Sequence, residues 1–122
     1  MTDHRLPFVS VIIPVLNGER TIRECLVSLL RVDYLPERGE ILVVDNGSTD
    51  RTAEIINSFP VRYLGEERRG KSYARNRGIE ASKGEILAFT DADCVVSIRG
   101  IFREIGGKAS RRMRISTKRL GP

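Results

Sequence analysis

Four short apolar runs alternate along the chain with segments that repeat their apolar residues at helical spacing. The first run, Phe8–Ile13, is nearly continuous and rich in β-branched residues. This pattern predicts a strand that is buried on both faces and that stops at Pro14. Three later apolar runs predict further strands, at residues 41–44, 61–64 and 86–90.

Two helices are predicted between the first three strands. The first opens at about Asn17 and presents one apolar stripe to the core, formed by Ile22, Cys25, Leu26, Leu29 and Leu30. The second runs to about Ser58, and a side chain of Ser48, Thr49 or Asp50 can cap its first turn.

A third helix is predicted over about residues 71–83. Gly84 stands where a glycine commonly ends a helix. Three small residues, Ala74, Gly78 and Ala81, share one side of this helix. They would let the helix pack close to a sheet.

This alternation of strands and helices predicts an α/β fold, a Rossmann-like parallel sheet with helices on both faces. In open sheets of this kind, ligands bind beyond the carboxyl ends of the strands. Polar residues collect after the first, second and fourth strands, namely Asn17, Glu19, Asp45–Asp50, Asp91 and Asp93. We therefore expect a binding site at that edge.

The chain divides into three parts by its pattern. Residues 1–97 form the predicted core, and helical spacing of isoleucines and Phe102 predicts a short helix over residues 98–106. Residues 107–122 are basic and lack apolar periodicity, so we expect this tail to be disordered. An unpaired sheet edge beside the fourth strand, covered by self-association as a homo-oligomer, is also expected.

The net charge of +5 belongs to the tail. Six of the 21 basic residues lie between Lys108 and Pro122, and the other 15 face 16 acidic residues. The near-neutral body argues against nucleic acid as a partner, although binding by the tail stays an alternative. No apolar run has membrane-spanning length and Met1–Arg5 lacks a signal-peptide pattern, so we expect a cytoplasmic protein without membrane association.

The segment Asp91-Ala92-Asp93 carries the clearest candidate chemistry. Carboxylates at positions i and i+2 of an extended segment project to the same side. Two such charges repel unless a cation lies between them, and Mg²⁺ or Mn²⁺ accepts carboxylate together with phosphate oxygens. The pair therefore predicts a metal site that holds a phosphorylated ligand. A solvated turn or a cap for the next element is the alternative.

Four motifs in this order resemble family 2 glycosyltransferases with the GT-A fold. They are Pro14-Val15-Leu16-Asn17 with Glu19, Val43–Asp50, Gly70–Asn76 and Phe89–Asp93. The resemblance covers about residues 7–96, which correspond to the nucleotide-sugar-binding half of the family. It implies a donor that is a UDP- or GDP-linked sugar, with Mg²⁺ or Mn²⁺ as cofactor.

The resemblance also implies roles for single residues. Pro14, Val15, Asn17 and Glu19 would line the nucleobase and ribose, and Asp45 with Asn46 would hold the base. Many members have two acids at the latter positions, so Asn46 leaves the identity of the base open. Arg75 corresponds to a basic residue near the base or diphosphate. Asp91 and Asp93 would bind the metal, and the remaining binding-site assignments are Ser48, Lys71 and Ala92. Helix capping by Ser48, and solvent-exposed helix charges at Lys71 and Arg75, are the alternatives.

The later half of the family, which supplies the acceptor site and the catalytic base, is not recognisable here. The sequence has no acidic residue after Glu104. We therefore expect the donor-binding part of an inverting glycosyltransferase, as a fragment, a natural truncation or a chain with an altered end. The alternative function is a catalytically incomplete nucleotide-binding or interaction module.

Overall fold

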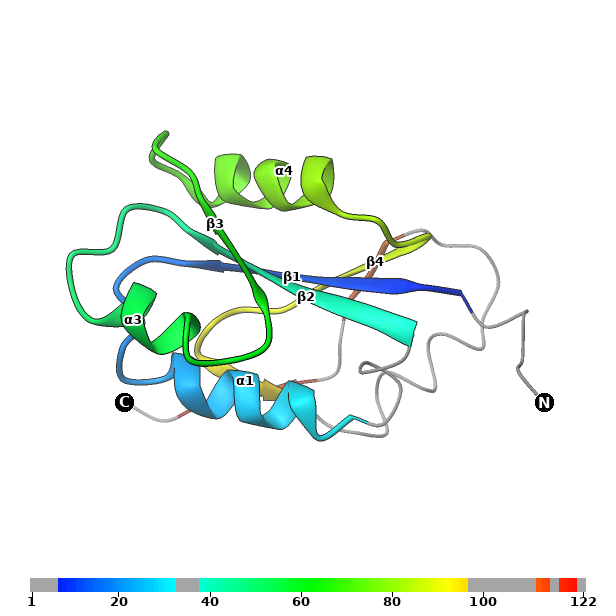
Figure 1. Cartoon of the computed structure of the whole chain (residues 1–122), viewed down its shortest axis with the longest axis horizontal. Coiled ribbons are helices and arrows are strands. Elements are labelled where there is room, and N and C mark those ends of the chain that lie inside the picture. Colours follow the sequence, from blue (N-terminus) through cyan, green and yellow to red (C-terminus); the bar gives the residue numbers. More distant parts are fainter. Residues whose placement is uncertain (1–6, 33–37, 97–111, 115–116, 121–122) are drawn as a thin grey trace.

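Five parallel strands form one sheet at the centre of the computed structural model, which describes residues 7–32, 38–96, 112–114 and 117–120 (Figure 1). They are β1 (Val9–Val15), β2 (Gly39–Asp45), β3 (Arg62–Gly65), β4 (Ile86–Phe89) and β6 (Arg112–Arg114). Their order is β3-β2-β1-β4-β6. The parallel α/β sheet predicted from the alternating pattern is confirmed.

Helices cover both faces of this sheet (Figure 1). α1 (Ile22–Leu30) and α3 (Thr52–Ile56) lie on one face, and α4 (Lys71–Ala81) lies on the other. Alternate residues of β1 point to opposite faces of the sheet, so Val11 and Ile13 pack with α1 whereas Ile12 packs with α4. In the described part of the chain, no helix is both long and apolar enough to cross a membrane.

The small residues of α4 allow the close packing that the sequence predicts. Ala74 and Gly78 are buried against the sheet. A Cβ at position 78 would lie 2.5 Å from Cγ2 of Ile12, closer than two carbons can approach. α4 therefore rests directly on β1 at this point.

Pro14 lies inside β1, so the prediction that the strand stops there is wrong. The carbonyl of Ile12 accepts from the Thr90 amide on the β4 side, whereas the carbonyl of Val15 accepts from the Asn46 amide on the β2 side. The missing N–H of Pro14 therefore faces the β4 side. Since β4 pairs with β1 only as far as Ile12, the strand loses no ladder hydrogen bond at the proline.

Gly84 does not end α4, which contradicts the prediction from its position. The helix ends at Ala81, and the following Ser82 is already extended. Gly84 instead lies against β1, where a Cβ would be 2.6 Å from the Ser10 nitrogen and 2.9 Å from the Phe8 oxygen. The glycine is needed for close approach between two backbone segments.

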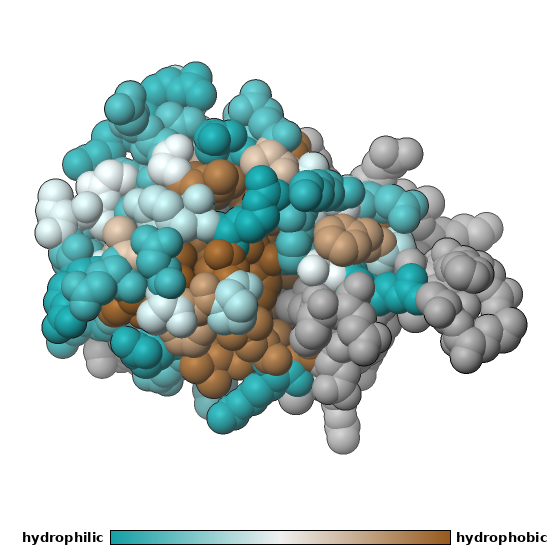
Figure 2. Space-filling view, in the orientation of Figure 1, coloured by the Kyte–Doolittle hydropathy of each residue, from teal (hydrophilic) through white to brown (hydrophobic). Residues whose placement is uncertain are grey.

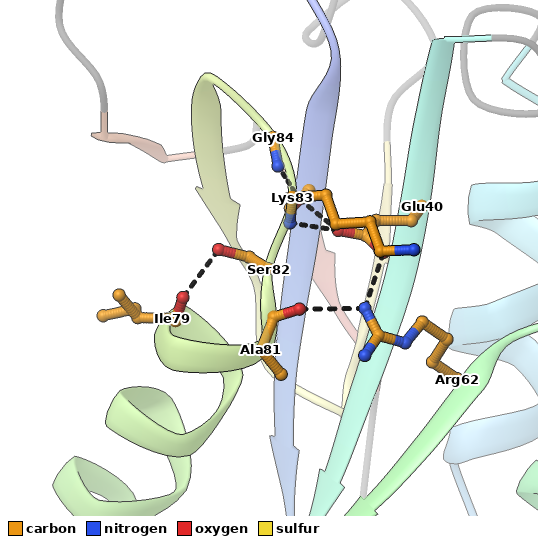
Figure 3. Close-up of polar contacts among 8 residues, drawn as sticks. Glu40, Arg62, Ile79, Ala81, Ser82, Lys83 and Gly84 are labelled. Atoms are coloured by element: carbon orange, nitrogen blue, oxygen red, sulfur yellow. Dashed lines mark hydrogen bonds and ion pairs between the residues drawn. The ribbon is translucent and has the colours of Figure 1, made fainter.

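The carboxylate of Glu40 joins three segments at the amino end of the sheet (Figure 3). It accepts hydrogen bonds from Oγ of Ser10 at 2.6 Å, from Nη1 of Arg62 at 2.9 Å and from the Lys83 amide at 2.7 Å. Desolvation by burial works to raise the pKa of Glu40, but these donors outweigh it and lower the pKa below 4.5. The network ties the loop after α4 to β1, β2 and β3.

Two parts of the basic tail form strands, in contrast to the disorder expected for residues 107–122. β6 pairs in parallel with β4 over residues 87–89, so it covers the edge that we expected to be unpaired. β7 (Thr117–Arg119) pairs antiparallel with β5 (Cys94–Val96) in a separate two-stranded sheet. The helix expected at residues 98–106 lies outside the described residues.

β3 is the outer strand on the other side of the sheet and crosses the front of the view in Figure 1. Figure 2 shows apolar side chains in the middle of this face. Around β3, Val61 and Leu64 are only partly buried and Tyr63 is 37% exposed. Apolar side chains therefore reach the surface at the β3 edge.

Candidate functional site

The candidate site is built from the loops that follow β1, β2 and β4 at their carboxyl ends. In this parallel sheet β1 is central, with β2 on one side and β4 on the other. The loop after β1 is therefore flanked by Asp45 and Asn46 after β2 and by Asp91 and Asp93 after β4. The three polar clusters singled out in the sequence share one edge of the sheet, as expected.

Side chains lock the first two loops together. Asn17 adopts a left-handed backbone conformation, with φ of 52°. The backbone N–H of Asn17 donates to Oγ of Ser48 at 2.8 Å, and the side-chain Oδ1 of Asn17 accepts from the backbone N–H of Thr49 at 2.8 Å. An Asn tolerates this conformation because its short side-chain amide can form hydrogen bonds with nearby backbone groups. Ser48 thus acts as a loop-to-loop acceptor in this structure, and it does not cap α3.

Asp50 and Thr52 extend the same junction. Oδ1 of Asp50 accepts from the Thr52 amide at 2.9 Å and also from the Thr52 hydroxyl. Oγ1 of Thr52 in turn accepts from the Gly18 amide at 2.8 Å, and Oδ2 of Asp50 accepts from the Glu19 amide at 3.2 Å. Desolvation works to raise the pKa of Asp50, but the hydrogen bonds from Thr52 and Glu19 outweigh it and lower the pKa. The turn 17–19 is therefore held in one conformation before any ligand binds.

Asp45 is 4% exposed and has a donor on each carboxylate oxygen. Oδ1 accepts from the Ser48 amide at 2.9 Å, and Oδ2 accepts from the hydroxyl of Tyr63 at 2.7 Å. Desolvation and the hydrogen bond to the neighbouring carboxylate raise the pKa of Tyr63 to about 12. A carboxylate can accept about four hydrogen bonds, so Asp45 keeps capacity for a ligand donor.

Asn46 is 5% exposed, and the loop after β3 uses its amide group. Nδ2 donates to the carbonyl oxygens of Glu66 and Arg68, at 3.0 and 2.8 Å. Oδ1 accepts from the Gly70 amide at 2.9 Å. Both N–H groups of the amide are thereby paired within the protein. The side chain fixes the loop 66–70 that leads into α4.

The start of α4 carries a row of cationic and aromatic groups. The carboxylate of Glu66 accepts from the backbone and side chain of Arg68, and the Arg68 guanidinium lies 4.7 Å from the centre of the Tyr73 ring. Lys71 and Arg75 follow on the helix. Arg75 is partly exposed and makes no hydrogen bond or ion pair with the described residues.

Asp91 and Asp93 attract two cationic side chains. Nζ of Lys71 lies 3.2 Å from Oδ1 of Asp91. The guanidinium of Arg119, on β7, forms a short ion pair with Oδ2 of Asp93 and lies 3.8 Å from Oδ2 of Asp91. The two aspartate side chains are 30% and 39% exposed. Each aspartate side chain is therefore in contact with both the protein and the solvent.

The same pair offers a donor set for a divalent cation. Ligand atoms of Asp91, Asp93 and Cys94 lie within 4.8 Å of one another. Two hard carboxylate oxygens suit Mg²⁺ or Mn²⁺, whose remaining positions water or phosphate would fill. Sγ of Cys94 lies 3.4 Å from Oδ1 of Asp93. Ala92, between the two aspartates, packs against the core and so holds their backbone in place.

Pro14 and Val15 are buried in β1, whereas Asn17 and Glu19 are exposed at the rim. Contacts of Asn17 with Ser48, of Gly70 with Asn46 and of Lys71 with Asp91 link the four motifs at one edge. Sequence reasoning missed three groups that the structure adds to the site, namely Tyr63, Thr52 and Arg119. No local motif marks them, because each reaches the site from another element or through tertiary pairing.

The chain matches the model of the family described as "Glycosyl transferase family 2" over residues 10–103, which is most of its length. The chain belongs to glycosyl transferase family 2. The matched region includes every residue of the candidate site except Arg119. The GT-A resemblance seen in the four motifs is confirmed by this match.

The chain is also similar in sequence to a curated glycosyltransferase and in fold to solved structures. Glycosyltransferase AglE of Haloferax volcanii is 48% identical over 95 residues, which are 73% of this chain and 31% of AglE. The mannosyltransferase PcManGT from Pyrobaculum calidifontis, in complex with GDP-Man and Mn²⁺, superposes with a TM-score of 0.74 at 32% identity. That match covers 80% of this chain and 31% of PcManGT.

A Staphylococcus aureus TarS structure, spanning residues 1–349 with UDP-GlcNAc, gives a TM-score of 0.71 at 30% identity. The match covers 80% of this chain and 30% of the TarS 1–349 chain. This chain therefore spans about a third of the length of AglE, of PcManGT and of the TarS 1–349 chain.

Proposed function

We propose that this chain is the donor-binding part of a metal-dependent inverting glycosyltransferase. Its ligand would be a nucleoside-diphosphate-sugar, UDP- or GDP-linked, whose sugar passes to an acceptor. The observation that carries the proposal is the convergence of the loops after β1, β2 and β4 at one sheet edge. Two structural neighbours, PcManGT and TarS, are complexed with GDP-Man and UDP-GlcNAc respectively, which supports this ligand class.

The nucleoside would lie over the junction of the first two loops. Pro14, Val15, Asn17 and Glu19 would line the base and ribose, and the preset turn at Asn17 would cost little entropy on binding. Asp45 would accept a hydrogen bond from a base N–H.

Asn46 would act indirectly. Its amide already pairs with three backbone groups of the loop 66–70. By fixing that loop, it would place Lys71 and Arg75 toward the diphosphate. Arg75 suits a phosphate because its planar fork can donate two parallel hydrogen bonds.

Asp91 and Asp93 would hold Mg²⁺ or Mn²⁺ at the diphosphate end. The bound ion would offset the charge that builds on the departing nucleoside diphosphate. We assign the catalytic base to no described residue, because a general base must reach the acceptor hydroxyl and nothing among the described residues marks where an acceptor binds.

A second candidate is a nucleotide-binding or interaction module without transfer activity. The contact of Arg119 with both aspartates favours it, because that cation occupies the place where a metal is expected. Nucleotide binding that Mn²⁺ does not strengthen would support the module. Binding that depends on Mn²⁺ would support the donor site of an enzyme.

Isothermal titration with UDP and GDP, with and without Mn²⁺, tests the proposal. The variant Asp91→Asn/Asp93→Asn should lose the metal-dependent part of the affinity. The matched control Glu80→Gln/Glu85→Gln removes two exposed charges outside the candidate site and should bind like the wild type. Absence of binding to either nucleotide, with the fold intact by circular dichroism, would refute the proposed function for this chain.

A further inference from the structure

Arg119 reaches the candidate metal ligands from a part of the chain that the nucleotide-binding function does not use. It lies on β7, directly opposite Cys94 in the ladder with β5. The amide of Leu120 also donates to the carbonyl oxygen of Asp93 at 2.7 Å. The strand is therefore anchored on the backbone of the Asp91-Ala92-Asp93 segment.

The guanidinium of Arg119 bridges the two carboxylates. It pairs with Oδ2 of Asp93 and lies 3.8 Å from Oδ2 of Asp91. These two carboxylates are the ones that would bind Mg²⁺ or Mn²⁺. A cation that bridges a repelling acid pair stabilises it in the way that a metal ion does. One carboxylate pair cannot fully engage both cations at once.

We propose that Arg119 is an intramolecular competitor for the divalent cation at Asp91 and Asp93. The guanidinium and the metal ion bind the pair in alternation. This gives the basic tail a role, because β7 delivers a cation to the donor site when no metal is bound. The inference rests on the metal role proposed above for the two aspartates.

Under competition, metal binding weakens the contact of Arg119 with the aspartates, and that contact weakens metal binding. By linkage, the factor by which Arg119 lowers Mn²⁺ affinity equals the factor by which Mn²⁺ weakens the arginine contact. The Arg119 side chain is 66% exposed, so each ion pair is modest in water. Removing the charge should therefore raise Mn²⁺ affinity by about fivefold to tenfold.

The test is a Mn²⁺ titration of the full chain without nucleotide, read by electron paramagnetic resonance of the free ion. Arg119→Gln should bind Mn²⁺ about fivefold to tenfold more tightly than the wild type. Lys118→Gln is the matched control, since Lys118 is exposed on the neighbouring position of β7 and pairs with no described acid. Its Mn²⁺ affinity should stay within about twofold of the wild type.

Unchanged or weaker Mn²⁺ binding by Arg119→Gln overturns the proposal. An equal gain in Lys118→Gln also overturns it, because the effect would then come from net charge. If no variant binds Mn²⁺, the metal role of the aspartates fails together with the proposal. Donor binding is then decided separately by UDP and GDP titration without metal.

A measurement on the wild type avoids any dependence on how a variant folds. The side-chain Nε–H signal of Arg119 should move toward that of a free guanidinium as Mg²⁺, which is diamagnetic, is added. A signal that stays fixed while Mg²⁺ shifts the Asp91 and Asp93 amides would contradict competition. Parallel movement of all three signals would support it.

Discussion

The hydroxyl of Tyr63 donates a hydrogen bond to Oδ2 of Asp45, with 2.7 Å between the two oxygens. Tyr63 belongs to the edge strand β3, whereas Asp45 ends β2 in the interior of the site. The phenol therefore fixes the orientation of the carboxylate that is proposed to read the nucleobase. It also supplies a donor to a charge that is almost fully buried.

Replacing Tyr63 by Phe should weaken both stability and nucleotide binding. The variant leaves Asp45 with one donor fewer, which should cost about 1–2 kcal/mol in the free energy of unfolding. Urea denaturation and calorimetry with UDP and GDP measure the two effects. Tyr73→Phe is the control, because the Tyr73 hydroxyl has no hydrogen bond with a described residue. Equal behaviour of the two variants would show that the Tyr63–Asp45 contact does not matter.

Replacing Asn46 by Asp should destabilise the loop 66–70. A carboxylate in place of the amide would face the carbonyl oxygens of Glu66 and Arg68 without a proton to donate. We expect a loss of about 2–3 kcal/mol in the free energy of unfolding, measured by urea denaturation. Asn76→Asp, at an exposed position of α4, should change it little. A stable Asn46→Asp variant would mean that the loop can rearrange around an acid.

Close packing of α4 on β1 predicts that alanine substitution destabilises the protein at Gly78 but not at Gly65. Gly78→Ala places a methyl group 2.5 Å from Cγ2 of Ile12, so overpacking should cost about 1–3 kcal/mol in thermal or urea unfolding. Gly65→Ala meets no atom within 4 Å and should be nearly neutral. Equal stability of the two variants would contradict the described packing.

Stability in acid should depend on Glu40. Its pKa is lowered in the folded state, so its contribution is complete above pH 4.5 and is lost as the pH falls through the lower folded-state value. Glu40→Gln should be less stable than the wild type at pH 7, and the difference should shrink as the pH falls below 4.5. Urea midpoints at a series of pH values measure this. A difference that is independent of pH would rule out the carboxylate as its source.

Local patterns predicted the buried strands, the apolar stripe of α1 and the small residues of α4, because each depends on spacing within one element. The four polar motifs also predicted the sheet edge at which the polar loops gather. The predictions that β1 stops at Pro14 and that Gly84 ends α4 were wrong, because the roles of both residues depend on neighbouring strands. Pro14 faces a place where β4 has ended, and Gly84 touches β1. No spacing rule reveals such contacts.

The roles of Asn46 and Arg119 could not be predicted from the sequence, for a related reason. The amide of Asn46 is committed to a loop about twenty residues away, and Arg119 arrives through the β5–β7 ladder. The tail has no apolar periodicity, yet two of its segments form strands. Backbone pairing with an existing edge does not require an apolar pattern, so composition alone predicted disorder.

The most direct test of the central claim is to map where a donor nucleotide binds on the whole chain. Backbone amide NMR spectra would be recorded with UDP or GDP and Mg²⁺, and then with a trace of Mn²⁺. We expect shifts and paramagnetic broadening at the carboxyl edge, at Asn17, Ser48 and Ala92, with Glu40 and Lys83 at the opposite end unaffected. Shifts confined to the amino end, or none at saturating nucleotide, would contradict a donor site at this edge.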